Sequence, residues 1–337
     1  MTIAVDLMGG DRAPDEIAKG SFRAAHDLDI EIKLVGQEDV LAKQFKRRGR
    51  RNGRVSAIEA AEIVGMSDAP TAAWRAKKDS SISVGLELVR TGEAQAFVSA
   101  GNSGAIAAVS LFTLGMMPAT ERPAIATLYT TLDGHVAIML DLGANVDCRP
   151  SLLAEFGQLG SEFMTKVFQV PSPRVALVNI GEEKNKGTKL VRDAYELLEK
   201  TQLNFIGNAE GFDIPKGKAD VFIMDGFTGN VVLKLAEGLA DSIFTSIKHS
   251  LRQSLAARIS QLLWGPALRS TLTHWDYSRI GGAPLLGVQG TVVMAHGRSD
   301  AKDIENAIGL AVRMVREGWS SSPDPAKLGA DPAHLNA

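Results

Sequence analysis

Residues 221–230 read VFIMDGFTGN, an apolar run that passes directly into a loop containing two glycines and an asparagine. The same order recurs in five other places: residues 3–7 before 9–11, 96–99 before 101–104, 135–140 before 141–145, 175–180 before 181–183, and 204–206 before 207–208. Glycines allow a backbone to approach a ligand closely, and a helix that follows such a loop offers unpaired N–H groups to an anion. Because the carboxyl ends of parallel strands share one edge of a sheet, we expect these loops to form a cleft there for phosphate or another oxyanion.

The apolar runs are continuous, as is typical of strands that are buried on both faces of a parallel sheet. Segments with an apolar face at helical spacing occupy residues 152–167, 188–198 and 304–316, and Thr188 is placed to cap the second of them. This alternation predicts a doubly wound α/β fold in a single domain that spans residues 1–337. The segment 320–337 is rich in Pro, Ser and Asp, so we expect a loosely ordered tail there.

The overall composition is that of a globular protein. The chain has 337 residues, of which 45% are hydrophobic, and a net charge of −2, so nothing global points to nucleic acid as a partner. The single cysteine, Cys148, excludes an intramolecular disulfide framework and suits a reducing cytosol. No apolar run approaches ~18 residues, and the N-terminus lacks the pattern of a signal peptide. We therefore expect a cytoplasmic protein without a transmembrane helix.

Two segments depart from the α/β pattern. Residues 45–54 contain six basic side chains and two glycines, which predicts a solvated loop or, alternatively, a surface for an acidic partner. Residues 239–280 lack strand character and are predicted to form a helical hairpin. The Gly265-Pro266 pair breaks this hairpin among large apolar residues, although an exposed turn is normally polar.

An apolar tip with cationic flanks is the composition of an interfacial membrane anchor. A contact within a dimer or with the core explains the same residues equally well. The residues concerned are Leu262, Leu263, Trp264 and Leu268 at the tip, and Arg252, Arg258 and Arg269 beside it.

Motifs for metal binding and for covalent catalysis are absent from the sequence. It has no His/Cys metal-ligand spacing, no Gly-x-Gly-x-x-Gly, no complete nucleotide-binding P-loop and no Gly-x-Ser-x-Gly. What remains is positioning chemistry. Lys184 and Lys186 follow the apolar run 175–180, and each is either a phosphate ligand or a solvated lysine. Asn230 precedes a predicted helix, so its amide either donates to an oxyanion or caps that helix.

Short motifs spread over the chain are together similar to those of the bacterial phosphate acyltransferases of glycerophospholipid synthesis, the PlsX family. They extend from the first residues to about residue 318, and their combination is specific. The motifs are IAVDLMGGDRAP (3–14), KKDSS (77–81), SAGNSGA (99–105), ERPAI (121–125), DLGANVD (141–147), NIGEE (179–183), FIGN (205–208), DGFTGN (225–230), and LGVQG (286–290) with His296-Gly297.

The resemblance implies a three-layer α/β/α fold with a mostly parallel sheet, like that of phosphotransacetylase and the isocitrate and isopropylmalate dehydrogenases, usually as a homodimer. The implied reaction transfers an acyl group from acyl-carrier protein to inorganic phosphate, without a metal or organic cofactor. Its product, acyl-phosphate, goes to the membrane glycerol-3-phosphate acyltransferase. This context favours an enzyme that associates peripherally with the inner face of the membrane.

The resemblance also implies roles for individual residues. Lys186 and Asn230 are the expected catalytic residues, although Lys184 lies in the same loop and the choice between the lysines stays open. The absence of a Ser-His-Asp set fits direct attack of phosphate on the thioester. The expected phosphate- and substrate-binding residues are Gly9, Gly10, Asp11, Gly101, Asn102, Ser103, Gly104, Lys184 and Gly229.

Three other functions compete with this one. A phosphotransacetylase would act on coenzyme A thioesters, and a nicotinamide-dependent hydroxyacid dehydrogenase would share the fold, although the dinucleotide fingerprint is missing. A membrane scaffold would use the hairpin without turnover. Because carrier protein is acidic, the hypothesis of an acyl-carrier-protein-dependent enzyme also predicts a basic surface for this partner, either at residues 47–54 or at the arginines of the hairpin.

Overall fold

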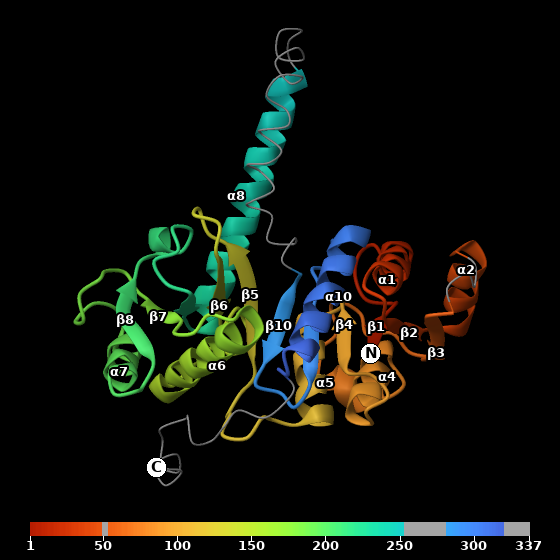
Figure 1. Cartoon of the computed structure of the whole chain (residues 1–337), viewed down its shortest axis with the longest axis horizontal. Coiled ribbons are helices and arrows are strands. Elements are labelled where there is room, and N and C mark those ends of the chain that lie inside the picture. Colours follow the sequence, from red (N-terminus) through yellow and green to blue (C-terminus); the bar gives the residue numbers. More distant parts are fainter. Residues whose placement is uncertain (49–52, 253–280, 320–337) are drawn as a thin grey trace.

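The computed structural model describes residues 1–48, 53–252 and 281–319. Within these residues, one sheet has the strand order β3-β2-β1-β4-β11-β10-β5-β6-β9-β7-β8 (Figure 1). The strands are β1 (Thr2–Asp6), β2 (Glu31–Gly36), β3 (Val55–Glu59), β4 (Ala96–Ser99), β5 (Ala124–Thr130), β6 (Val136–Leu140), β7 (Arg174–Val178), β8 (Asn204–Ala209), β9 (Val221–Ile223), β10 (Ala283–Leu286) and β11 (Thr291–Met294). The helices are α1 (Asp15–Asp27), α2 (Glu38–Arg48), α3 (Pro70–Ala76), α4 (Ser81–Arg90), α5 (Ser103–Leu114), α6 (Pro150–Phe168), α7 (Lys189–Leu198), the short η1 (Gly211–Asp213), α8 (Gly226–Arg252) and α10 (Ala301–Arg316).

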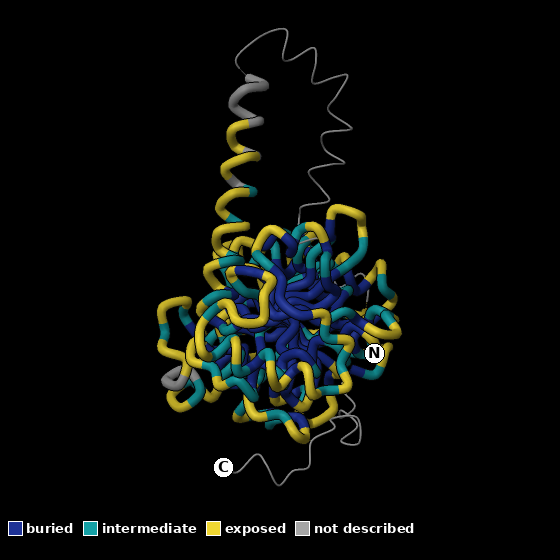
Figure 2. The backbone as a smooth tube through the Cα atoms, turned by 90° about the vertical axis from the view of Figure 1, so that its left-hand side faces the viewer, coloured by how far each residue is buried: buried dark blue, intermediate teal, exposed yellow. Residues whose placement is uncertain are grey.

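Helices cover both faces of the sheet, which confirms the predicted three-layer α/β/α fold. Successive residues of one strand enter different core clusters: Ile3 and Val5 join the cluster under α1, α6 and α10, whereas Ala4 joins the cluster under α4 and α5. Such strands are buried on both faces, and for that reason their sequences are continuously apolar. Figure 2 shows the buried strands enclosed by more exposed helices and loops.

Strand directions divide the sheet into two blocks. Strands β3, β2, β1, β4 and β11 pair in parallel, and so do β6, β9, β7 and β8. Between the blocks, β10 and β5 pair antiparallel with their neighbours, so the two blocks run in opposite directions. The expectation that all the strand tips share one edge is therefore wrong, because these two strands reverse the chain direction at the centre of the sheet.

The two faces of the sheet are covered differently. One face carries a single core cluster that extends across both blocks, whereas the other carries two clusters, one under α4 and α5 and one beside the start of α8. Ile125 on β5 packs at the border of both smaller clusters. The helical layer on this second face thus has a gap over the central strands.

Several predicted elements are confirmed and others are corrected. Thr188 caps α7, and its side chain accepts a hydrogen bond from the N–H of Val191. Residues 45–48 belong to α2 rather than to a solvated loop, and residues 207–208 belong to β8 rather than to a glycine loop. Strands β3, β10 and β11 were not predicted.

Helix α8 begins earlier than the sequence pattern indicates. Asp225 lies immediately before it and accepts hydrogen bonds from the N–H and the hydroxyl of Thr228, at 2.9 and 2.7 Å. Asn230 therefore lies inside the helix, and the interpretation of Asn230 as its N-cap is wrong.

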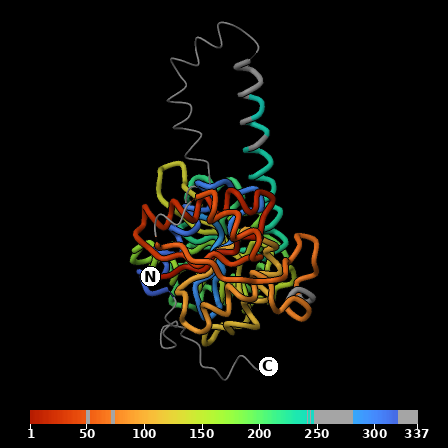
Figure 3. The backbone as a smooth tube through the Cα atoms, turned by 90° about the vertical axis from the view of Figure 1, so that its right-hand side faces the viewer, coloured from red at the N-terminus to blue at the C-terminus, as the bar shows by residue number. Residues whose placement is uncertain are grey.

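The far end of α8 projects well beyond the body of the molecule (Figures 1 and 3). Arg252 is its last described residue. The hairpin tip with Arg258, Leu262, Leu263, Trp264, Leu268 and Arg269 lies outside the described residues, as does the segment 320–337. Among the helices of the described residues, none is long and apolar enough to cross a membrane.

The first turn of α8 packs so closely on the loop after β6 that a side chain is excluded at Gly229. A Cβ there would collide with the carbonyl oxygen of Asp141. We expect Gly229→Ala to lower the free energy of unfolding by about 1–3 kcal/mol, as overpacking does elsewhere, and to lower the melting temperature in a thermal unfolding experiment.

Gly238 provides the matched control on the same helix, because a Cβ there would meet nothing within 4 Å. Gly238→Ala should raise stability slightly, by about 0.5–1 kcal/mol, since alanine is the better helix former. Equal effects of the two substitutions would contradict the close approach at Gly229.

Candidate active site

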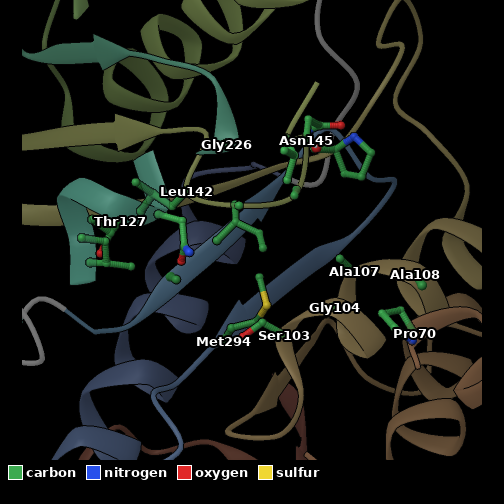
Figure 4. A pocket seen from close by; sticks show the side chains of 18 of the residues that line it. Pro70, Ser103, Gly104, Ala107, Ala108, Thr127, Leu142, Asn145, Gly226 and Met294 are labelled. Atoms are coloured by element: carbon green, nitrogen blue, oxygen red, sulfur yellow. Dashed lines mark hydrogen bonds between the residues drawn. The ribbon is translucent and has the colours of Figure 1, made fainter. Parts of the chain in front are cut away.

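A cavity of about 750 Å³ occupies the gap between α5 and α8 (Figure 4). Its floor is formed by the central strands, through Ile125, Thr127, Ala283 and Met294. One wall comes from α5, with Ser103, Gly104, Ala107, Ala108 and Leu111. The other comes from α8 and the loop after β6, with Gly226, Phe227, Asn230, Leu233, Lys234, Glu237 and residues 142–146. Although the strand blocks run in opposite directions, loops from both blocks therefore line one cavity.

The first turn of α5 offers backbone donors to this cavity. The Asn102 side chain caps the helix by accepting from the N–H of Ala105 at 3.1 Å, and its amide nitrogen donates to the carbonyl oxygens of Met66 and Asp68, both at 3.0 Å. The amide of Asn102 is thus used within the protein. In the described part of the chain, the N–H groups of Ser103 and Gly104 have no hydrogen-bond partner, and they lie at a helix N-terminus, where anions bind.

The glycine loop after β1 braces this wall from behind. Asp6 is buried, and its carboxylate accepts hydrogen bonds from the N–H of Gly9 at 3.2 Å and from the hydroxyl of Ser99 at 2.6 Å. The Ser99 hydroxyl in turn accepts from the N–H of Gly101 at 3.0 Å. Burial raises the pKa of Asp6. The N–H groups of Gly9 and Gly101 are therefore already bonded inside the protein.

Gly10 and Asp11 lie beside the same wall without lining the cavity. Gly10 has a φ of +104°, which favours glycine, and the N–H of Asp11 donates to the carbonyl oxygen of Gly297 at 2.7 Å. This contact joins the loop after β1 to the chain that follows β11. These predicted binding residues therefore hold the loops together in this structure.

A second buried carboxylate, that of Asp141, shapes the opposite wall. It accepts hydrogen bonds from the N–H groups of Ile125 at 3.0 Å and Ala144 at 3.2 Å, and from both nitrogens of Asn145 at 2.6 and 3.0 Å. Burial raises its pKa. The Asn145 carbonyl oxygen then accepts from the N–H of Gly226 at 2.8 Å, which attaches the start of α8 to this loop.

Asn230 faces the cavity from the second turn of α8. Its side chain is exposed and has no hydrogen-bond partner in the described residues, so the amide is available to a ligand. Gly229, by contrast, donates its N–H to the carbonyl oxygen of Asp225 at 2.9 Å and serves close packing.

The cavity also contains polar side chains that the sequence interpretation did not include. Lys234 pairs with Glu237 at 2.8 Å, and the Nε2 atom of His296 lies 3.9 Å from the same carboxylate. The Nδ1 atom of His296 accepts from the N–H of Arg298 at 3.1 Å, which in the neutral ring leaves the proton on Nε2. Only the motif His296-Gly297 pointed to this residue, and β11, which carries it into the site, was not predicted.

Neither predicted lysine lines the cavity. Lys184 pairs with Glu199, whose hydrogen bond raises the pKa of the lysine, and its Nζ atom lies 5.3 Å from the centre of the Tyr195 ring. Lys186 is exposed, and its carbonyl oxygen accepts from the Asn179 amide at 3.2 Å. Arg122 and Lys234 are the basic lining residues other than His296 in the described part of the chain.

The three-layer α/β/α fold of this chain is also the fold of solved phosphotransacetylases. A solved phosphotransacetylase from Streptococcus pyogenes has this fold, with a TM-score of 0.61 and 17% identity over 94% of each chain.

Sequence comparison defines the family. A family model described as "Fatty acid synthesis protein" matches residues 1–322. A phosphate acyltransferase from Heliobacterium modesticaldum is 47% identical over 321 residues, which are 95% of each chain. Another, from Alkaliphilus oremlandii, is 44% identical over 332 residues, which are 96% of this chain and 99% of that protein. The chain belongs to this family of fatty acid synthesis proteins. The two relatives named above are both phosphate acyltransferases.

A carboxyl group with a raised pKa contacts one of the residues that line the cavity. Glu155 on α6 accepts a hydrogen bond from the N–H of Glu121 at 2.8 Å, and burial raises the pKa of its side chain from 4.5 to about 7. Between these pH values the folded protein keeps a proton that the unfolded chain has lost, so the free energy of unfolding falls as the pH rises through this window. We expect Glu155→Gln to flatten that dependence when urea unfolding is measured from pH 4.5 to 8.

Glu162 on the same helix provides the control, since it is half-buried and forms an i,i+4 pair with Lys166 at 2.7 Å. Glu162→Gln should leave the slope of stability against pH unchanged. If Glu155→Gln behaves in the same way as this control, burial does not raise the pKa of Glu155.

Proposed function

We propose that this chain transfers an acyl group from an acyl-carrier-protein thioester to inorganic phosphate. The carbon–sulfur bond of the thioester breaks, a carbon–oxygen bond to phosphate forms, and acyl-phosphate and the free thiol of the carrier protein result. Family membership supports the reaction, and the observation that carries it to a site is the cavity between α5 and α8.

Phosphate is proposed to bind at the first turn of α5, where Ser103 and Gly104 present unpaired N–H groups. At neutral pH phosphate is already an anionic oxygen nucleophile, so no side chain has to generate an alkoxide. Holding phosphate and thioester in one cavity makes the attack effectively intramolecular. This explains how acyl transfer proceeds without an acyl-enzyme.

The carbonyl oxygen becomes negatively charged as phosphate attacks, and Asn230 is the proposed donor to it. Its amide lines the cavity and has no other partner in the described residues. Lys186 stays a candidate for binding phosphate on the strength of the family resemblance. Lys234 is the alternative that the geometry offers, because it lines the cavity beside Glu237 and His296.

The reaction itself is tested with purified protein, palmitoyl-acyl-carrier protein and inorganic phosphate. We expect acyl-phosphate to form, which hydroxylamine traps as a hydroxamate. Palmitoyl-coenzyme A in parallel separates this activity from that of a phosphotransacetylase, since faster turnover of the coenzyme A thioester would favour the latter. Absence of hydroxamate with both thioesters would reject the proposed function.

Asn230→Ala should lower kcat by at least about 100-fold, as the loss of one oxyanion donor typically does. The melting temperature should not change, because the side chain is exposed and unpaired in the described structure. Turnover is measured by hydroxamate formation at saturating phosphate. A near-normal kcat in the folded variant would remove Asn230 from the mechanism.

The lysines are separated by three matched substitutions, Lys184→Ala, Lys186→Ala and Lys234→Ala. We expect Lys186→Ala to lower kcat by at least about 100-fold and to raise the KM for phosphate. Lys184→Ala should keep a kcat close to that of the wild type, because the Lys184 side chain pairs with Glu199. A loss confined to Lys234→Ala would assign the phosphate-binding role to the lysine inside the cavity.

We further propose that the protein is a homodimer that contacts the inner face of the cytoplasmic membrane and supplies a membrane acyltransferase acting on glycerol-3-phosphate. Exposed apolar residues recur every four positions on α8, so that each lies next to the following one on adjacent turns, and this exposed apolar row favours a second copy as partner. They are Phe227, Val231, Leu235, Leu239 and Ile243. Membrane contact is supported by the composition of the hairpin tip.

A further inference from the structure

Helix α5 is apolar on more than one face. Its residues Ala105, Ile106, Val109 and Leu114 are buried in the core cluster that it shares with α4. A second row at helical spacing, Gly104, Ala107, Ala108 and Leu111, lines the cavity instead. A helix that is apolar all round is normally buried all round. The described residues cover this second row only in part, since α3 packs against α5 with Pro70 beside Gly104, and the remaining apolar surface of the row faces the cavity.

The surroundings of this row are apolar as well. Ile125 on β5, Leu142 and Val146 after β6, and Pro123 before β5 line the same cavity. Among the charged lining residues, Lys234 and Glu237 come from α8 and gather with His296, whereas Glu121 and Arg122 precede Pro123. Figure 4 shows Ala107 and Ala108 on α5 beyond Ser103 and Gly104 along the cavity wall. The lining side of α5 from Gly104 to Leu111 is therefore apolar, while charged groups line other parts of the cavity.

We propose that the row Gly104, Ala107, Ala108 and Leu111 binds the fatty acyl chain of the thioester, and that the small side chains of Ala107 and Ala108 set the chain length that the cavity accepts. This inference rests on the proposed function, because it assumes an acyl substrate. Ser103 and Leu111 lie eight residues apart on α5, about 12 Å along the helix axis, so the wall accommodates an extended hydrocarbon of several carbons.

The phosphopantetheine arm of the carrier protein is the competing occupant of this wall. Its amide groups would lose their hydrogen bonds to water along a surface that offers no polar side chain between Gly104 and Leu111 on the lining face. A hydrocarbon loses nothing there and gains by burial. The row also begins at the helical turn that carries the unpaired N–H groups of Ser103 and Gly104. An acyl chain bound along this row therefore has its carbonyl carbon next to the proposed phosphate site at Ser103 and Gly104.

The test compares octanoyl- and palmitoyl-acyl-carrier protein as substrates of Ala108→Leu. The larger side chain should lower kcat/KM for the palmitoyl substrate at least about tenfold more than for the octanoyl substrate, which is the discrimination that one or two methylene groups typically give in an apolar pocket. Thr113→Leu adds bulk to the same helix at a position that does not line the cavity, and it should leave the ratio of the two kcat/KM values unchanged.

Equal losses with both substrates would overturn the proposal and favour the pantetheine arm, and so would an unchanged ratio in folded Ala108→Leu. If that variant does not fold, Ala107→Ser replaces it: a hydroxyl of similar volume on the wall should weaken the palmitoyl substrate selectively.

A binding measurement separates this inference from the proposed function. The fluorescence of cis-parinaric acid reports an apolar groove without turnover, and its affinity should fall at least about tenfold in Ala108→Leu and stay unchanged in Thr113→Leu. Binding of this kind in a wild-type protein that forms no acyl-phosphate would reject the reaction but keep the groove. If the wild-type protein forms acyl-phosphate, but Ala108→Leu changes neither the chain selectivity nor the binding of parinaric acid, the reaction is kept and the groove is rejected.

Discussion

The incomplete helical layer on one face of the sheet is the feature on which the site depends. Strands β10 and β5 reverse the strand direction between the two parallel blocks, so α5 belongs to one block and α8 to the other. Each helix packs on its own core cluster, and neither lies over the centre of the sheet. Moving either helix inward would expose the residues it buries. The cavity is therefore a consequence of the topology rather than of any single side chain.

Two buried carboxylates give this cavity fixed walls. Asp6 ends β1 in the first block and Asp141 follows β6 in the second, and each accepts hydrogen bonds from N–H groups of the loop that comes after it. Burial raises the pKa of both groups, and the hydrogen bonds from these N–H groups lower it in part. The N–H groups of Gly9, Gly101, Ala144 and Asn145 are used in this bracing. In the described part of the chain, the first turn of α5 and the amide of Asn230 keep donors that a ligand can use.

The sequence predicts the layered fold because strands buried on both faces must be continuously apolar, and β1, β4, β6 and β9 are recognisable on that basis. Strand β10 escapes recognition because it contains Pro284, which lowers strand propensity. Strand β11 is no shorter than the recognised β4, so its length does not explain why the sequence pattern fails to predict it. The position of Asn230 after an apolar run predicts its place in the site. The pairing of Lys184 with Glu199 and the position of His296 beside Glu237 depend on contacts between distant parts of the chain, which no local pattern contains.

The composition of α5 suits one wall to the two unlike groups that we propose to bind there. An anion needs unpaired donors, which a helix provides only in its first turn, where the N–H groups have no acceptor within the helix. A hydrocarbon needs a surface without unsatisfied polar groups, which the following turns provide because their backbone groups are bonded to one another and their side chains on this face are Ala107, Ala108 and Leu111. The boundary between the two environments falls within a single turn of helix. A reaction that joins a phosphate oxygen to the first carbon of an acyl chain needs such a boundary at the reacting bond.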